Sequence, residues 1–95
     1  MTAQLRPDCG LAIHPSAMIS ASAEIGAGTL VFHGSKIQAG TQVGRGVIVN
    51  TGGSIDHECT IGDFAHIAPN VTLCGYVEVG EGANIGAASV VIPGV

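Results

Sequence analysis

The chain has 95 residues, 15 of them glycine, with two phenylalanines, one tyrosine and no tryptophan. So few bulky side chains can fill only a narrow core, and the length allows one domain at most. The formal net charge is -4, and three residues are Lys or Arg. This balance excludes the basic surface that nucleic acids and anionic membranes bind.

The apolar residues and the cysteines indicate a cytoplasmic protein. Gly, Ser, Thr and Asn interrupt the apolar residues every few positions, so no run approaches the roughly 20 residues that cross a bilayer. The first residues lack the basic and then apolar stretches of a signal peptide. Cys9, Cys59 and Cys74 are odd in number and form no C-x-x-C pair, which favours reduced thiols over disulfides or a cysteine metal site.

Two segments follow one another along the chain. Residues 1–12 carry the apolar Leu5 and Leu11, and we expect them to cap the open end of the repeat that follows. From residue 13 an aliphatic residue occurs at every sixth position without an insertion: Ile13, Ile19, Ile25, Val31, Ile37, Val43, Val49, Ile55, Ile61, Ile67, Leu73, Val79, Ile85 and Val91. A helix would repeat near 3.6 residues and a plain amphipathic strand at 2. A period of six with Gly, Asp or Asn in each unit predicts short strands separated by corners.

Each six-residue unit, or hexad, has an inside and an outside. If the aliphatic residue is position 1, position 5 is always small or β-branched. In each strand, position 6 lies between position 5 of the same hexad and position 1 of the next hexad. Side chains alternate along a strand, so positions 5 and 1 point inward together and position 6 points outward. Burial of the aliphatic residues alone does not balance the entropy of ordering the backbone, so we expect partner chains to contribute to stability.

Titratable side chains are concentrated in the middle of the repeat. Asp56, His57 and Glu58 occupy positions 2 to 4 of the hexad 55–60, which predicts a corner outside the core. His66 is at position 6 of the next hexad, on an outward face. An exposed imidazole has a pKa of about 6.5, and a neighbouring carboxylate can orient it to accept a proton near neutral pH. The arrangement indicates a general base.

The hexads, such as IGDFAH, VGEGAN and IGAGTL, resemble the hexapeptide repeat of the left-handed β-helix acyltransferases. The resemblance covers residues 13–95 and implies an all-β, left-handed parallel β-helix. Three hexads would form one triangular coil, so that residues eighteen apart stack. Within it, VNTGGSIDHECTIGDFAHIAPNVTLCG is similar to the active-site segment of sugar acetyltransferases related to the sialic acid O-acetyltransferases and the bacillosamine-pathway N-acetyltransferases.

This resemblance implies roles for five residues. His57 would be catalytic, as the general base that deprotonates an acceptor amine or hydroxyl, and Glu58 would support it. His66, Asn50 and the backbone around Gly75 would lie near the thioester of acetyl-CoA, the acetyl donor. The family also implies a homotrimer with its active site between two subunits, and a sugar acceptor. We expect no metal site.

Two alternatives remain open. A γ-class carbonic anhydrase shares the fold and binds zinc through three histidines, but His14, His33, His57 and His66 do not show its His-x4-His spacing. A catalytically silent structural or interaction module is favoured by two departures from the family. The N-terminal α/β domain that binds nucleotide sugars is not found, and the sequence stops at VIPGV, where relatives continue into further coils. His14 and His33 are themselves expected to be structural or merely exposed.

Overall fold

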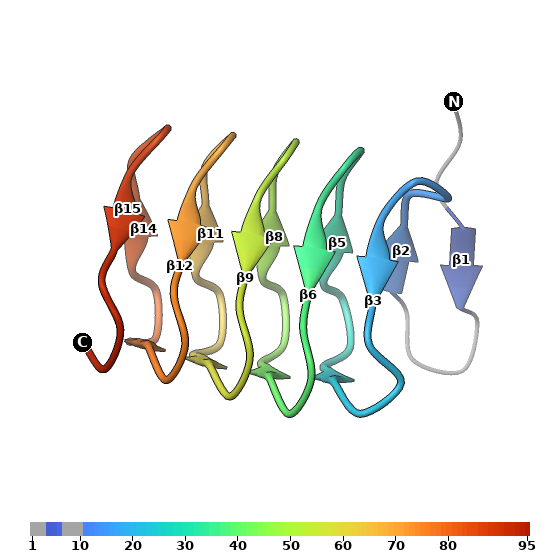
Figure 1. Cartoon of the computed structure of the whole chain (residues 1–95). Helices are drawn as coiled ribbons and strands as arrows, with labels where there is room; N and C mark the ends of the chain where they lie inside the picture. Colours follow the sequence, from blue (N-terminus) through green and yellow to red (C-terminus); the bar gives the residue numbers. More distant parts are fainter. Residues whose placement is uncertain (1–3, 7–10) are drawn as a thin grey trace.

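The structure is a computed structural model that describes residues 4–6 and 11–95. The described residues form fifteen short strands and no helix, so they contain no helix that could cross a membrane. The strands alternate with tight turns, and the chain winds around one axis as a stack of coils (Figure 1). Positions 3 and 4 of each hexad form the turns, which explains the period of six: one hexad supplies one side and one corner of a coil.

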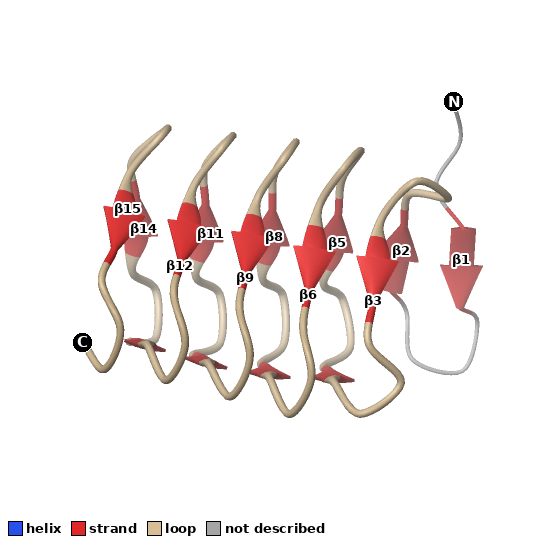
Figure 2. Cartoon of the chain, in the orientation of Figure 1, coloured by secondary structure: helices blue, strands red, loops and turns tan. Residues whose placement is uncertain are grey.

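Strands of successive coils stack into three sheets that form the sides of a prism (Figure 2). Sheet A contains β2 (Leu11–Ile13), β5 (Leu30–Val31), β8 (Ile48–Val49), β11 (His66–Ile67) and β14 (Asn84–Ile85). Sheet B contains β3 (Met18–Ile19), β6 (Lys36–Ile37), β9 (Ser54–Ile55), β12 (Thr72–Leu73) and β15 (Val90–Val91). Sheet C contains β4 (Glu24–Ile25), β7 (Gln42–Val43), β10 (Thr60–Ile61) and β13 (Glu78–Val79).

The pairing register confirms three hexads per coil. In sheet A, Ile13 pairs with Val31 and Val31 with Val49, each eighteen residues further along the chain. Every pair among β2 to β15 is parallel and has the same eighteen-residue offset. The chain is therefore the all-β parallel β-helix that the repeat predicts.

The core is the narrow column expected from positions 1 and 5. Position 1 is buried from Val31 to Val79, and position 5 is buried from Thr29 to Val77. The buried hydroxyls in this column donate hydrogen bonds to backbone carbonyls, so burial leaves them satisfied: Thr29 Oγ1 to Gly44 at 2.8 Å, Ser35 Oγ to Asn50 at 2.9 Å and Thr41 Oγ1 to Asp56 at 2.7 Å. Ile13 is buried as well, but the other position-1 residues toward the two ends of the stack are only half-buried: Ile19, Ile25, Ile85 and Val91.

The corners carry an unusual backbone. From the hexad 25–30 onward, every position 4 has a positive φ, and five of these residues are not glycine: Glu58, Phe64, Asn70, Tyr76 and Ala88. A side chain in this left-handed region is disfavoured, which is why glycine is usual there. Three of the five side chains lie over the position-4 glycine of the preceding coil: Glu58 over Gly40, Phe64 over Gly46 and Asn70 over Gly52. Glycine in one coil thus makes room for the side chain of the next.

The N-terminal segment adds one antiparallel strand. β1 (Gln4–Arg6) pairs with β2 and extends sheet A at its first edge. The cap expected over residues 1–12 stays a prediction, because residues 1–3 and 7–10 and the side chains of Leu5 and Leu11 are outside what the structure describes. Cys9 is among those residues.

Candidate functional site

His57 lies at the corner between sheets B and C, the B–C corner, and its side chain is exposed. The hydrogen bonds that it makes with described residues use its backbone. Its N–H donates to Asp56 Oδ1 at 2.8 Å, and its C=O accepts the N–H of Tyr76 at 3.1 Å. The imidazole lies along the next coil, since a Cβ on Gly75 would be 2.9 Å from both Cε1 and Nε2 of His57. The ring therefore rests on Gly75, which has no side chain to displace it.

Tyr76 covers a second side of the imidazole. The two ring centroids are 5.3 Å apart and the rings are nearly perpendicular, at 89°. This edge-to-face arrangement is one of the favoured geometries for aromatic pairs. Tyr76 is not among the residues that were predicted from the sequence. The sequence does contain a signal for it: Tyr76 is an aromatic residue at position 4, whereas other coils have glycine at this position of the same corner, namely Gly40 and Gly94.

Glu58 follows His57 in the chain, but its side chain takes the opposite direction. A Cβ on Gly40 would lie 2.5 Å from each carboxylate oxygen of Glu58, so the carboxylate covers the preceding coil. The imidazole of His57 covers the following coil. At this corner the two side chains are neighbours that point to different coils, and the supporting role of Glu58 stays a prediction.

His66 lies on sheet A between Ile48 and Asn84 of the adjacent coils. It points outward as predicted, but its Nε2 is buried and has no hydrogen-bond partner among the described residues. Asn50 is at the corner that follows β8, where its Oδ1 accepts the N–H of Thr51 at 2.8 Å.

The five predicted residues fall into two groups. Glu58, His57 and Gly75 share the B–C corner, whereas His66 and Asn50 lie on sheet A and just beyond it. In a three-sided prism the B–C corner is the edge opposite sheet A. The molecule measures 33 × 23 × 21 Å, so one chain holds the two groups on opposite sides.

The other two histidines form a separate cluster around Ser16. The Ser16 hydroxyl is 2.8 Å from His14 Nδ1 and 2.9 Å from His33 Nδ1, and the two imidazoles meet edge to face at 5.0 Å. His14 is buried, and this burial, followed by the proximity of His33, lowers its pKa. In the described part of the chain, no three His, Cys, Asp or Glu residues could hold a metal ion.

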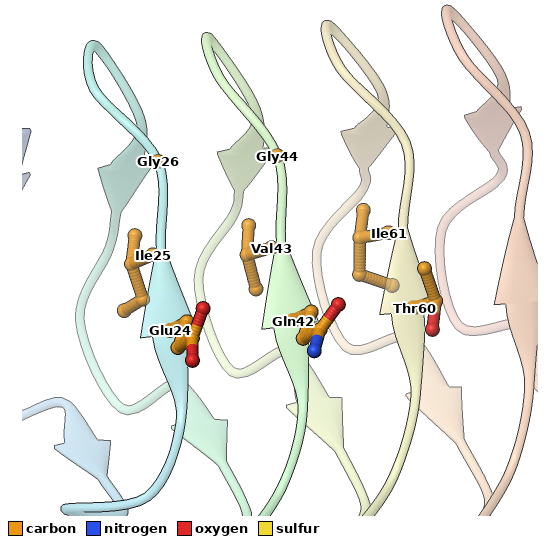
Figure 3. A pocket seen from close by; sticks show the side chains of 8 residues that line it. All are labelled: Glu24, Ile25, Gly26, Gln42, Val43, Gly44, Thr60 and Ile61. Atoms are coloured by element: carbon orange, nitrogen blue, oxygen red, sulfur yellow. The ribbon is translucent and has the colours of Figure 1, made fainter.

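A shallow hollow of about 310 Å³ lies against sheet C, away from the five predicted residues. Figure 3 shows its lining on β4, β7 and β10, with the polar side chains of Glu24, Gln42 and Thr60 in a row that runs across the strands, one on each strand. The outer surface of sheet C is therefore polar. By contrast, sheet A presents Leu30 and Ile48 at the same position 6.

Comparison with known families adds to this geometry. Residues 58–93 match the bacterial transferase hexapeptide family, described by six repeats. Over these residues the chain has the hexapeptide repeat of this family. The expected all-β, left-handed parallel β-helix is thereby confirmed.

Solved structures similar to this hexapeptide-repeat chain include acetyltransferases. The acetyltransferase domain of PglB from Neisseria gonorrhoeae FA1090, in complex with acetyl coenzyme A, is 38% identical with a TM-score of 0.89, over 90% of this chain and 42% of that one. PerB from Caulobacter crescentus, in complex with CoA and GDP-perosamine, is 40% identical with a TM-score of 0.88, over 97% of this chain and 42% of that one. This chain thus spans less than half the length of either of those chains.

Proposed function

We propose that this chain transfers an acetyl group from acetyl-CoA to an amino or hydroxyl group of a sugar, with His57 as the general base. The observation that carries the proposal is the exposed imidazole of His57 resting on Gly75. This chain is 38% identical in sequence to the acetyltransferase domain of PglB and 40% identical to PerB. Those structures contain acetyl coenzyme A and CoA, respectively. The sugar class is supported by PerB, whose structure also contains GDP-perosamine.

The B–C corner offers the groups that this reaction needs. When bound, acetyl-CoA would supply the acetyl group as a thioester. His57 would accept the proton that the acceptor amine or hydroxyl loses as it attacks the thioester carbonyl; the C–S bond then breaks, and CoA leaves as the thiol with that proton. The N–H groups of Cys74 and Tyr76 donate to Val91 and His57, whereas that of Gly75 has no partner among the described residues. A free backbone N–H beside the base suits a developing oxyanion.

His66 supports the placement of acetyl-CoA. Buried polar atoms in proteins are nearly always hydrogen-bonded, so the Nε2 of His66, which has no partner among the described residues, suits a contact with a bound ligand. We propose that His66 and Asn50 hold the acetyl end of acetyl-CoA, together with the backbone at Gly75.

A homotrimer would complete this site. Position 6 normally faces water, yet on sheet A it carries Leu30 and Ile48 beside His66. A second copy whose B–C corner packs on sheet A would bring its own His57 toward this His66. The same contact repeated around a threefold axis closes a ring. We place the trimer in the cytoplasm, which the free thiols of Cys59 and Cys74 support.

The test is thiol release from acetyl-CoA with a panel of free and nucleotide-linked amino sugars between pH 6 and 9. His57→Ala should lower the rate by about 10²- to 10⁴-fold, the usual contribution of a general base. Glu58→Gln should cost less, because it changes only the charge near the imidazole. His33→Ala is the matched control, since His33 is another exposed corner histidine outside the proposed site.

Calorimetry with acetyl-CoA separates the possible failures. If the wild type binds acetyl-CoA and His57→Ala is as active as the wild type, the general base is another group. If the wild type neither binds acetyl-CoA nor acetylates any acceptor, the chain is a structural or interaction module.

A further inference from the structure

Tyr76 is in a conformation that its residue type disfavours. It is the one tyrosine in the sequence, its φ is 61° and its side chain is 63% exposed. A bulky side chain in the left-handed region is rare, and such residues gather at functional sites, where the surrounding structure holds them. Exposure on this scale means that burial in the core does not hold Tyr76 there.

The other corners show what normally accompanies this conformation. Where Glu58 and Phe64 have a positive φ, their side chains lie over Gly40 and Gly46 of the preceding coil. No glycine lies beneath Tyr76 in the preceding coil, because the residue eighteen positions before it is Glu58. The aromatic contact that the structure gives for its ring is with His57.

His57 is therefore enclosed on two sides by consecutive residues of the next coil. Gly75 lies under the ring, 2.9 Å from Cε1 and Nε2 to the place where a Cβ would be. Tyr76 stands against it at 89°, with 5.3 Å between centroids. The Tyr76 N–H also donates to the His57 C=O at 3.1 Å, which joins the two backbones. The His57 side chain is otherwise exposed and makes no side-chain hydrogen bond with the described residues, so packing against Gly75 and Tyr76 is what limits its motion.

We propose that Tyr76 is a positioning residue for His57. Its aromatic ring keeps the imidazole on Gly75 in one rotamer, so that the base meets the acceptor in a fixed orientation. The left-handed backbone at residue 76 is what directs the ring sideways onto His57. This inference rests on the proposed function of His57 as a base, but its structural part can be measured without any turnover.

Three variants separate positioning from stability. Tyr76→Gly removes the ring and places glycine where φ is positive, so the fold should be kept. Tyr76→Phe keeps the ring and removes the hydroxyl. Ala88→Gly makes the same backbone change at another corner, distant from His57 in the chain, and is the matched control.

The first measurement is the rotamer of His57, from the three-bond Hα–Hβ couplings in NMR spectra of the whole chain. We expect one rotamer in the wild type, Tyr76→Phe and Ala88→Gly, and averaged couplings in Tyr76→Gly. Couplings in Tyr76→Gly equal to those of the wild type would overturn the proposal.

The second measurement is the acetylation rate. Tyr76→Gly should lower kcat by about 10- to 100-fold, as expected for a misplaced catalytic group, with an unchanged KM for acetyl-CoA. Tyr76→Phe and Ala88→Gly should match the wild type. A fully active Tyr76→Gly would overturn the proposal. If instead the couplings behave as expected but the wild type acetylates nothing, positioning stands and the proposed function fails.

Discussion

Gly75→Ala would test the placement of His57 while leaving the backbone undisturbed. Gly75 does not require a positive φ, and the three atoms nearest to an added Cβ all belong to the His57 ring, at 2.9, 2.9 and 3.5 Å. Ordinary carbon contacts begin near 3.5 Å, so the ring must move by about 0.5 Å or more. Because it is the end of an exposed side chain, a strained χ angle should cost no more than about 1.5 kcal/mol.

Two opposing effects keep the stability change small. Replacing glycine restricts the unfolded chain and stabilises the fold by about 0.4–1 kcal/mol where the backbone permits alanine. The free energy of unfolding of Gly75→Ala should therefore stay within about 1 kcal/mol of the wild type. The rate of acetyl transfer should nevertheless fall by up to about 10²-fold, the loss that a misplacement of about 1 Å can cause in an active site.

The assay combines urea unfolding with thiol release from acetyl-CoA. Gly80→Ala is the control, because an added Cβ there has no atom within 4 Å and the backbone is again ordinary. It should keep full activity. In a His57→Ala background, Gly75→Ala should lower the rate no further. The reasoning is wrong if Gly75→Ala unfolds the chain, or if it keeps the wild-type rate in an active protein.

Further substitutions test the surface, the pH response and the packing. Ile48→Asp puts a charge on the outer side of sheet A and should convert a trimer to inactive monomers. Light scattering would detect the lower mass, whereas an unchanged mass would place the interface elsewhere. Burial lowers the pKa of His14, so the unfolded chain binds that proton more readily, and stability should fall as the pH drops below about 6.5 and level off below the folded pKa. Urea unfolding at pH 7 and 5 should show this loss, and His14→Gln should reduce it. Burial raises the pKa of the Cys59 thiol, so iodoacetamide should label Cys59 more slowly than the half-buried Cys74 in mass spectra; equal rates would contradict this. Gly26→Ala places a Cβ 2.6 Å from backbone atoms of the next coil and should cost about 1–3 kcal/mol in thermal unfolding; an unchanged Tm would show that the coils can separate there.

The fold was predictable from sequence because one period determines both the direction and the stacking of each residue. Position 1 points inward in every coil, so Val31 and Val49 could be placed one above the other by counting eighteen residues. The same count put His57 at a corner and His66 on a flat side, and the structure agrees.

Side-chain directions at the corners were not predictable, because they depend on what the neighbouring coil offers. Glu58 turns to Gly40, while His57 turns to Gly75. Adjacency in the sequence suggested that this acid and this histidine would face each other. The burial of His66 Nε2 could not be predicted either, because it depends on packing by residues from other coils.

The glycines under the corner side chains restrict how this solenoid can change its length. Gly40, Gly46 and Gly52 are needed because the coil that follows them has bulky residues at the same positions. A duplicated copy of residues 55–72 would place a second Glu58, Phe64 and Asn70 over the first ones, where no glycine makes room, so each added side chain would have to turn aside as Tyr76 does above Glu58. The coils are therefore not interchangeable modules. Their order along the axis is encoded, and a coil fits without such a rearrangement only where its small corner residues meet its neighbour's large ones.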